Sequence, residues 1–537
     1  MALNIADLLE HAVDVVPERT AVVCGDRQLT FRELDERANK LAHHLAAQGV
    51  GKDDHIGIYS RNSVESMEAM FAAYKLRARA VNVNFRYVAE ELRYLFDNAD
   101  LVALVHERQF VDRVADVLPS APKLKHVLVV EDGSDADYTR YNGVPYEGAL
   151  AEQSAERDFG ERSPDDLYIL YTGGTTGYPK GVMWRQEDVW RVLGGGIDFM
   201  TGEYVPDEWT LANQGADGPG LIRMPVSPLI HGAAQWAAFG GLFTGSPVVL
   251  VPQFDPHEVW RQVQEHKVNV LTMVGDAMGK PLLDAYREGD YDASSLVAIT
   301  SHAALFSQSL KQQYLEEFPN AVLTDAVGAS ESGFTGISMI SKDSDHSAGP
   351  RVNFSKQAVL VDDDNNLIEP KPGAVGRMAR GGHVPIGYYK DPEKTKSIFV
   401  EVDGKRYVVP GDYARYEEDG SVTLLGRGSQ SINTGGEKVY PEEVEGALKS
   451  YPGVFDVLVV GVPDERWGQR VGAVIQPDDG ASIDVPALIE HARTKIAGYK
   501  VPRSVWFVDQ VQRQPSGKPD YAWAKSYVEE HDADSTL

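Results

Sequence analysis

The sequence predicts an α/β protein with mostly parallel strands, followed by a smaller α+β unit at the C-terminal end. Short apolar runs of strand length alternate with helical patterns along most of the 537 residues. Near residue 350 this alternation changes to short strands separated by turn signals. At about 100–200 residues per domain, the length is enough for at least two domains.

The first 300 residues show the alternation clearly. Residues 31–46 place Leu34, Ala38, Leu41 and Leu45 on one stripe, which predicts a helix. Apolar runs flanked by such helices favour a parallel sheet with helices on its faces. Strands are predicted at 20–24, 56–60, 80–83, 101–105, 127–130, 167–171, 248–251, 268–274 and 296–300, and further helices at 63–76 and 89–98.

After residue 350 the pattern becomes antiparallel. The turn signals Asp-Asp-Asp-Asn-Asn at 362–366, Pro-Gly at 372–373 and Asp-Gly at 419–420 separate short apolar runs, which is typical of a small antiparallel sheet or barrel. Residues 426–429 resemble a linker, and 531–537 are expected to form a frayed polar tail. The strands are predicted at 359–361, 367–368, 406–409 and 422–425, and the last unit at 441–450 (helix), 454–462 (strand), 487–496 (helix) and 505–507 (strand).

Composition excludes several classes of protein. With 52 Lys and Arg against 80 Asp and Glu, the net charge is −28, which argues against nucleic acid or an anionic membrane as the main partner. Cys24 is the one cysteine, so an internal disulfide and a cysteine-based metal cluster are excluded. The acidic residues in 1–17 interrupt a signal-peptide pattern, and this segment is predicted as an amphipathic surface helix. Since no apolar stretch approaches the roughly 18 residues of a membrane span, we expect a soluble cytoplasmic protein.

The segment with the clearest chemistry is 171–182, YTGGTTGYPKGV. Its glycines let backbone N–H groups approach a phosphate, its threonines add donors, and Lys180 supplies a positive charge. A glycine pair alone is typical of a flexible turn, but three Gly, three Thr and a Pro-Lys-Gly end favour a phosphate loop. It is not a Walker loop, because Tyr178 and Pro179 separate Gly177 from Lys180.

Residues 172–181 resemble the phosphate loop of the acyl-adenylate-forming superfamily, which contains acyl-CoA synthetases, peptide-synthetase adenylation domains and luciferases. One position departs, Gly173, where Ser or Thr is usual. Four further family motifs follow in order: VGASE at 327–331, YVVPGD at 407–412, GRGSQSINTGGEKVYPEEVE at 426–445 and QPSGK at 514–518. The resemblance covers essentially the whole chain.

The resemblance implies both an architecture and a reaction. The expected N-terminal domain, residues 1–426, has two α/β sheets and a small barrel; a hinge at 427–430 joins it to a smaller mobile domain at 431–537. The expected reaction converts a carboxylic acid, ATP and CoA into acyl-CoA, AMP and pyrophosphate through an acyl-AMP intermediate. ATP, Mg²⁺ and coenzyme A are therefore expected, and the family suggests a homodimer.

The family's motifs also assign roles. Glu331 and Thr176 are expected at the metal, because hard oxygen donors suit Mg²⁺, and Ser330 at the α-phosphate or the metal shell. Asp412 is expected to accept the ribose hydroxyls and Arg427 to bond the ribose. The other nucleotide-binding residues are expected to be Thr172, Gly173, Gly174, Thr175, Gly177, Tyr178, Pro179, Lys180, Val327 and Gly328.

Lys518 resembles the family's catalytic lysine, which bridges the carboxylate and the α-phosphate while charge develops. In the family the small domain then rotates and withdraws this lysine, and Gly435 and Gly436 are expected to line the pantetheine channel. Lys180 and His231 are the other expected catalytic residues. His231, in PLIHGAAQW, resembles a histidine on the wall between acyl pocket and nucleotide; a packed core histidine is the alternative.

Three departures from the family bear on adenine contact, domain rotation and the acyl pocket floor. Val327 replaces the aromatic that usually stacks on adenine, Ser429 replaces a hinge Asp or Lys, and SHAAL at 301–305 replaces a Gly-Gly-Ala strand end. The amino-acid sequence of residues 178–199 is similar to that of actinobacterial acyl-CoA synthetases for steroid side-chain carboxylates and long-chain acids. Two other functions stay open: an acyl-AMP ligase serving a carrier protein, and a catalytically silent acyl- or nucleotide-binding protein.

Overall fold

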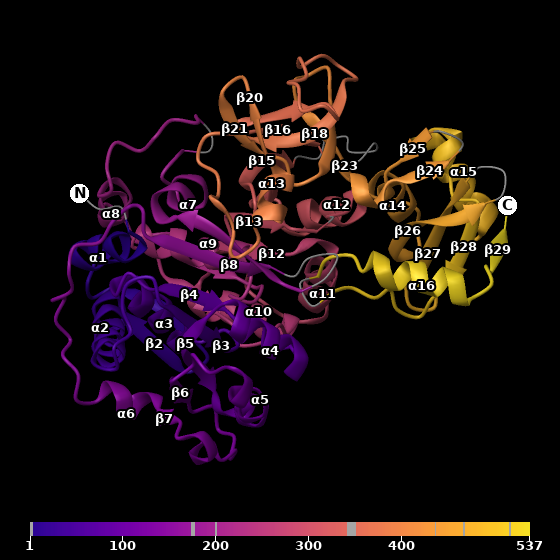
Figure 1. Cartoon of the computed structure of the whole chain (residues 1–537). Helices are drawn as coiled ribbons and strands as arrows, with labels where there is room; N and C mark the ends of the chain where they lie inside the picture. The colour runs from indigo at the N-terminus through magenta and orange to yellow at the C-terminus, as the bar shows by residue number, and fades with distance from the viewer. Residues whose placement is uncertain are drawn as a thin grey trace. The chain divides into compact units, whose positions relative to one another are not determined.

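The computed structural model describes residues 4–172, 178–198, 201–304, 306–340, 351–434, 437–464, 468–514 and 517–536 (Figure 1). The chain divides into two compact units. The first contains Met1–Thr272, Glu288–Leu296 and His383–Ser397, and the second Met273–Arg287, Val297–Gly382 and Ile398–Leu537. Among the helices so described, none combines the length and the apolar character that a membrane span requires.

The first unit contains a five-stranded parallel sheet in the order β4-β3-β5-β6-β7. Leu92 and Phe96 of one helix and Val114 of another pack on Leu104 in a single apolar core. Every strand and helix predicted between residues 56 and 130 is present. The elements are β3 (His55–Tyr59), α3 (Val64–Lys75), β4 (Arg79–Asn82), α4 (Ala89–Asn98), β5 (Leu101–Glu107), α5 (Val111–Val117), β6 (His126–Val130), β7 (Val144–Pro145) and α6 (Tyr146–Leu150).

A second sheet of this unit runs in the order β2-β1-β11-β10-β12, parallel except for the β1–β2 hairpin. The N-terminal helix α1 is more buried than the predicted surface helix, because even Glu10 is enclosed and pairs with the buried Lys75. These elements are α1 (Ile5–Val15), β1 (Thr20–Cys24), β2 (Arg27–Thr30), α2 (Phe31–Ala47), α8 (Thr210–Ala216), β10 (Arg223–Pro225), β11 (Val248–Leu250), α10 (Pro256–His266) and β12 (Val270–Met273).

A three-stranded sheet, β19-β9-β8, holds the segment that contains the predicted phosphate loop. β8 and β9 form an antiparallel hairpin, and β19 pairs with β9. Its elements and their neighbours are β8 (Leu167–Thr172), β9 (Lys180–Arg185), α7 (Gln186–Leu193), α9 (Gly232–Phe243), β19 (Gly387–Tyr388) and α13 (Pro392–Ile398).

In the second unit, β13 and β14 are parallel, and the strands that follow are antiparallel, as predicted. Their order is β13-β14-β15-β16-β23-β22-β18-β21-β20, with β17 beside β18. The predicted strand at 367–368 is reduced to one bridge between Leu367 and Val361. The elements are α11 (Gly275–Glu288), β13 (Ala298–His302), α12 (Gln308–Glu317), β14 (Val322–Ala329), β15 (Gly333–Ile340), β16 (Arg351–Phe354), β17 (Ala358–Val361), β18 (Val375–Arg380), β20 (Phe399–Val402), β21 (Lys405–Val408), β22 (Asp412–Tyr416) and β23 (Val422–Arg427).

The C-terminal α+β part has its own sheet with helices on both faces (Figure 1). Along β26, Val457 and Val459 pack with α14 and α15, while Leu458 and Val460 pack with α16. This period of two is what strand geometry requires of a sheet covered on both sides. The elements are β24 (Ile432–Thr434), β25 (Glu437–Val439), α14 (Pro441–Lys449), β26 (Val454–Asp464), β27 (Gly468–Pro477), α15 (Val485–Lys495), β28 (Ser504–Phe507), α16 (Tyr521–Glu530) and β29 (Ser535–Thr536).

The prediction of a frayed tail at 531–537 is wrong. β29 pairs with β28, and the Trp506 indole N–H donates to the His531 carbonyl at 2.9 Å. The backbone N–H of Phe507 donates to the Asp534 carboxylate at 2.7 Å. The tail is ordered because it satisfies backbone groups along the edge of β28, which a polar composition does not reveal.

Candidate functional site

The predicted phosphate loop joins the two strands of the β8–β9 hairpin. β8 ends at Thr172 and β9 begins at Lys180, and these two residues are register partners. Lys180 is therefore the first residue of a strand and not part of the loop. Tyr178 is exposed and stacks on Tyr94 at 4.3 Å between ring centroids, and Pro179 is buried. Five predicted residues lie outside the described ranges: Gly173, Gly174, Thr175, Thr176 and Gly177.

The Lys180 ammonium has a defined partner, the carboxylate of Asp391, with which it forms a short ion pair. Asp391 also accepts the backbone N–H of Lys394 at 2.9 Å and so caps the first turn of α13. The hydrogen bond from Lys180 holds the pKa of Asp391 below its ordinary value. The lysine is thus fixed at the mouth of the loop by a carboxylate that the sequence did not single out.

A buried asparagine fixes the surroundings of the loop. The Asn82 side-chain amide donates to the carbonyls of Tyr171 and Ile230, at 2.7 Å each, and its oxygen accepts the Tyr171 N–H at 2.8 Å. The strand entering the loop and the turn before His231 are therefore tied to one side chain. Sequence reasoning missed Asn82; the signal was a polar residue inside the predicted apolar strand 80–83.

His231 occupies the residue before helix α9, and its side chain is half-buried. A Cβ at the next residue, Gly232, would lie 2.6 Å from the Leu170 side chain. A side chain at this position would require the Leu170 side chain to move, so the turn sits directly on β8. The predicted place of His231 on the wall between acyl pocket and nucleotide stays a prediction.

In the second unit, Val327, Gly328 and Asp412 line one small cavity. Its volume is about 30 Å³, close to that of one water molecule. It therefore marks where β14, β18 and β22 meet and is smaller than a nucleotide. Val327 packs with Val352 and Leu360 and so contributes to an apolar surface.

Two residues predicted to hold the ribose come from different motifs and are brought together. Asp412 on β22 and Arg427 on β23 are register partners of an antiparallel pair. The Cα atoms of directly opposed residues in an antiparallel pair lie about 5 Å apart. Gly411, before the aspartate, has φ 104°, a left-handed conformation that favours glycine.

Ser330 and Glu331 lie in the turn between β14 and β15, and both are half-buried. Across the described residues, no group of three or more His, Cys, Asp or Glu side chains could enclose a metal ion. Mg²⁺ keeps several waters and usually takes one or two carboxylates together with phosphate oxygens. A single glutamate in a turn therefore fits that ion in a nucleotide complex, and does not fit an all-protein cage.

Lys518 lies in a tight loop between β28 and α16. Its carbonyl accepts the N–H of Gln514 at 2.8 Å, and Gly517 N–H donates to the Gln514 carbonyl at 2.8 Å. A Cβ at Gly517, where φ is 80°, would lie 3.0 Å from Val274 and 3.4 Å from Ala277. Glycine thus allows the lysine loop to lie against the start of α11.

His302 is a polar residue near Lys518 that sequence reasoning did not place in the site. It ends β13 and is 9% exposed; within the described part of the chain, neither ring nitrogen has a hydrogen-bond partner. Burial and then the charge of Lys518 lower the pKa of His302 to about 4, so the imidazole is neutral at pH 7. The departure SHAAL at 301–305 was the available signal.

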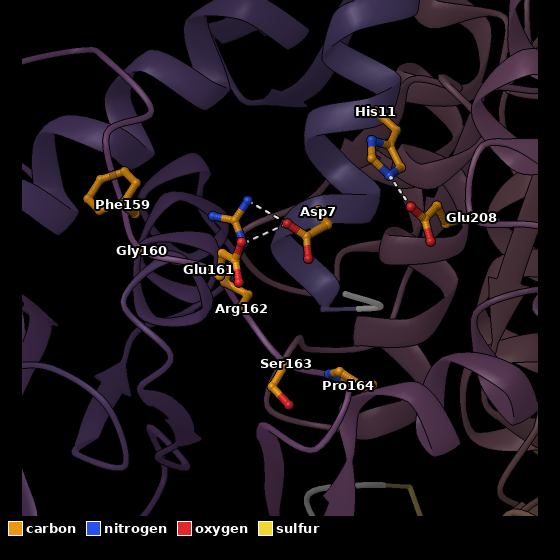
Figure 2. Close-up of a pocket in the computed structure, with 9 residues that line it drawn as sticks. All are labelled: Asp7, His11, Phe159, Gly160, Glu161, Arg162, Ser163, Pro164 and Glu208. Carbon is orange, nitrogen blue, oxygen red and sulfur yellow. Dashed lines mark hydrogen bonds and ion pairs between the residues drawn. The ribbon is translucent and has the colours of Figure 1, made fainter. Parts of the chain in front are cut away.

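A larger cavity of about 660 Å³ lies elsewhere, beside α1 (Figure 2). Ionisable side chains dominate it, and Figure 2 shows Arg162 directed at Asp7, with a shortest separation of 2.5 Å, and His11 at Glu208, 3.7 Å apart. None of the predicted site residues lines it. Its charged lining does not suit an apolar acid, so it is not the candidate site.

The structure brings the predicted residues together in two sets. Lys180, Thr172 and His231 belong to the first unit. The second unit contains Val327, Gly328, Ser330, Glu331, Asp412, Arg427 and Lys518. Gly435 and Gly436 lie outside the described residues, as does the side chain of Arg427.

The chain is similar over nearly its whole length to proteins of known name. The chain is 59% identical over 531 residues (98% of this chain, 96% of the relative) to 3-oxocholest-4-en-26-oate–CoA ligase of Rhodococcus rhodochrous. It is 58% identical over 535 residues (99% and 98%) to medium/long-chain-fatty-acid–CoA/3-oxocholest-4-en-26-oate–CoA ligase of Mycobacterium tuberculosis (strain CDC 1551 / Oshkosh).

The fold is shared with a solved structure, that of the anthranilate CoA ligase AuaEII in complex with anthranoyl-AMP. The TM-score is 0.86 over 98% of this chain and 97% of that chain, at 21% identity. Residues 443–518 match the family described as AMP-binding enzyme C-terminal domain. Residues 9–389 match the family described as AMP-binding enzyme, and the chain therefore belongs to the AMP-binding enzyme family.

Proposed function

We propose that this chain is an ATP- and Mg²⁺-dependent acyl-CoA ligase for large apolar carboxylic acids, with steroid side-chain acids and medium- and long-chain fatty acids as substrates. The observation that carries the proposal is near-full-length identity of 59% and 58% to two proteins named as CoA ligases for such acids. The residues expected to perform the chemistry support it as well: Lys180 lies in the first unit, and Asp412 and Lys518 lie in the second.

The first half-reaction joins the acid to AMP. A carboxylate oxygen of the acid attacks the α-phosphorus of ATP, the bond to the bridging oxygen breaks, and pyrophosphate leaves. Lys180 and the backbone N–H groups of its loop suit the oligophosphate, which gains negative charge at the leaving oxygen. Bound Mg²⁺, for which Glu331 is the proposed protein ligand, supplies further neutralisation of phosphate charge.

The nucleoside part of ATP is assigned to the second set. The Asp412 carboxylate has two oxygens that accept hydrogen bonds from both ribose hydroxyls, and Arg427 stands opposite on the next strand. Val327 supplies apolar contact to adenine in place of stacking. Lys518 is proposed to bridge the acid carboxylate and the α-phosphate, where negative charge develops in the transition state.

In the second half-reaction the CoA thiolate attacks the acyl carbon of acyl-AMP, and AMP leaves with the bonding electron pair. We propose that the domain at 431–537 rotates about a hinge relative to the domain at 1–426 before this step, as in the family. β23 ends at Arg427, and a short helical turn, η4 (Gly428–Gln430), precedes β24, which supports a hinge at 427–430. Gly435 and Gly436 are the proposed channel residues. We also propose a cytoplasmic location and a homodimer.

ATP–pyrophosphate exchange over a panel of acids, followed by detection of the thioester with CoA, tests the function. Exchange and thioester with large apolar acids are the expected results. Exchange without thioester, restored by a pantetheine-bearing carrier protein, would instead identify an acyl-AMP ligase. Nucleotide binding without exchange for any acid would identify a catalytically silent protein and refute the proposal.

A further inference from the structure

Four charged side chains form a continuous buried chain in the second unit. The Lys449 ammonium lies 2.8 Å from an Asp276 carboxylate oxygen and 2.9 Å from one of Asp456. The Arg513 guanidinium donates to both oxygens of Asp456, at 2.7 Å each. The Lys449 side chain is 2% exposed, and the other three are 8–14% exposed.

One end of this chain holds the loop of Lys518. Arg513 donates from Nη1 to the carbonyl of Gly517 at 3.1 Å, one residue before the lysine. Arg513 also forms a β-bridge with Pro519. The two-point pairing with Asp456 fixes the guanidinium plane, because the donors of arginine form a rigid fork. The fork therefore fixes the carbonyl next to Lys518.

The other end is anchored at the start of α11. The second carboxylate oxygen of Asp276 accepts the backbone N–H of Ser307 at 2.8 Å. The neighbouring Gly275 N–H donates to the Ser301 hydroxyl at 3.1 Å. Both contacts reach the segment around the end of β13, the strand that His302 ends. The four charged side chains thus connect the Lys518 loop to the segment around the end of β13.

We propose that Asp276, Lys449, Asp456 and Arg513 are positioning residues that fix Lys518 for the adenylation half-reaction. The inference rests on the proposed function and on the role of Lys518 in it. The four residues contribute two positive and two negative charges, so this group of side chains is neutral as a whole. Lys518 adds a charge whose position must be correct to within a fraction of an ångström, since misplacement by about 1 Å costs about a hundredfold in rate.

Stability alone is a weak reason for such an arrangement. Buried ion pairs lose in desolvation much of what they gain in attraction, and apolar replacements are often equally stable. Directional contacts, in contrast, fix geometry. Burial opposes the charge on Lys449 and Arg513, but their carboxylate partners outweigh it and raise the pKa of both groups. Glu445, buried on α14, is the further ionisable group whose charge acts on both cations.

The test compares the two half-reactions in one variant. Arg513→Lys keeps the charge and loses the fork. We expect it to lower kcat of ATP–pyrophosphate exchange at least tenfold, with KM for ATP and for acid within twofold. Thioester formation from supplied acyl-AMP and CoA should stay within twofold. Arg493→Lys, an exposed pair with Glu490 on α15, is the matched control and should change neither rate.

A double variant separates positioning from general damage. If Arg513 acts through Lys518, then Arg513→Lys should cost nothing further in a Lys518→Ala background. Asp276→Asn, which keeps an acceptor for Ser307 while removing the charge that pairs with Lys449, should reproduce the selective loss in a smaller degree. The Asp276→Asn variant therefore tests the positioning role even if the Arg513→Lys variant does not fold.

Three outcomes overturn the inference. Equal loss of both half-reactions in Arg513→Lys and Asp276→Asn would show a structural role only. Unchanged exchange in both variants would show no role at all. If none of the tested acids supports ATP–pyrophosphate exchange by the wild-type protein, the proposed function fails and the inference fails with it. This result differs from the second outcome, in which the wild type is active and the variants are unaffected.

Discussion

Lys180, the first residue of β9, is ion-paired with Asp391, 211 residues later in the chain, at the start of α13. Their side chains are 36% and 26% exposed. The lysine that is expected to meet the ATP phosphates is thus held in advance by a carboxylate. A phosphate ligand must compete with Asp391 for this ammonium group, which leads to a first prediction.

Asp391→Asn should lower KM for ATP about 1.4- to fivefold, because it removes a competing charge worth about 0.2–1 kcal/mol at this exposure. Asparagine still accepts the Lys394 N–H, so the cap of α13 is kept. Initial-rate exchange kinetics at varied ATP measure the effect. Glu393→Gln, an exposed neighbour paired with Lys396, is the control and should leave KM unchanged; a rise in KM with Asp391→Asn would contradict the competition.

Lys518→Ala should separate the two half-reactions. Since the ammonium is proposed to act only while acyl-AMP forms, exchange should fall by two or more orders of magnitude, each tenfold corresponding to about 1.4 kcal/mol of barrier. Conversion of supplied acyl-AMP and CoA into thioester should remain near the wild-type rate. Single-turnover assays with isolated acyl-AMP measure this, and equal loss in both steps would remove Lys518 from its assigned role.

Asn82→Ala should destabilise the first unit. It leaves the carbonyls of Tyr171 and Ile230 and the N–H of Tyr171 without their buried partner, and each such loss costs roughly 1–3 kcal/mol unless water enters. We expect the free energy of unfolding to fall by about 3 kcal/mol or more in denaturant titrations. Asn84→Ala, in the same segment, is the control and should cost less; an equal loss in both variants would contradict the special role of Asn82.

The sequence predicted most strands and helices because their apolar periods are strong: residues 20–24 and 89–98 were predicted with the observed bounds. It did not predict that Lys180 begins a strand, since Gly and Pro dominate the local pattern while the pairing with Thr172 is set by the hairpin register. Asp391 and Asn82 were missed for the same physical reason. Their partners lie 211 and 89 residues away, and local composition carries no trace of such pairing.

Glu445 provides a pH prediction for stability. Its burial on α14 raises its pKa from an ordinary value of 4.5 to about 7. Between these values the folded protein keeps a proton that the unfolded chain gives up, so the free energy of unfolding falls as pH rises from 4.5 to 7 and then levels off. The substitution Glu445→Gln makes this side chain neutral at every pH and keeps an acceptor for the Val459 N–H.

The Glu445→Gln variant should therefore lose less stability over this range, and it should exceed the wild type by about 1–3 kcal/mol at pH 8, at ~1.4 kcal/mol per pKa unit. Denaturant titrations at pH 5, 6, 7 and 8 measure the difference. Glu490→Gln, exposed on α15, should run parallel to the wild type. Parallel curves for Glu445→Gln as well would show that this carboxyl is ionised normally.

Substrate size should determine specificity. Burying apolar surface gains roughly 25 cal/mol per Å², so each additional stretch of about 55 Å² of buried hydrocarbon is worth about a tenfold gain in binding. Short acids cannot collect this energy, and amino acids bring a charged group into the pocket, which costs more than it gains. We expect kcat/KM to be highest for steroid side-chain acids, then for medium- and long-chain fatty acids, with acetate, propionate and amino acids negligible.

Pyrophosphate release measured over this panel at fixed ATP and CoA gives the order. A preference for acetate, benzoate or an amino acid would refute the steroid and fatty-acid assignment, while the adenylation chemistry would stand, because the phosphate, ribose and lysine contacts do not depend on the acyl chain.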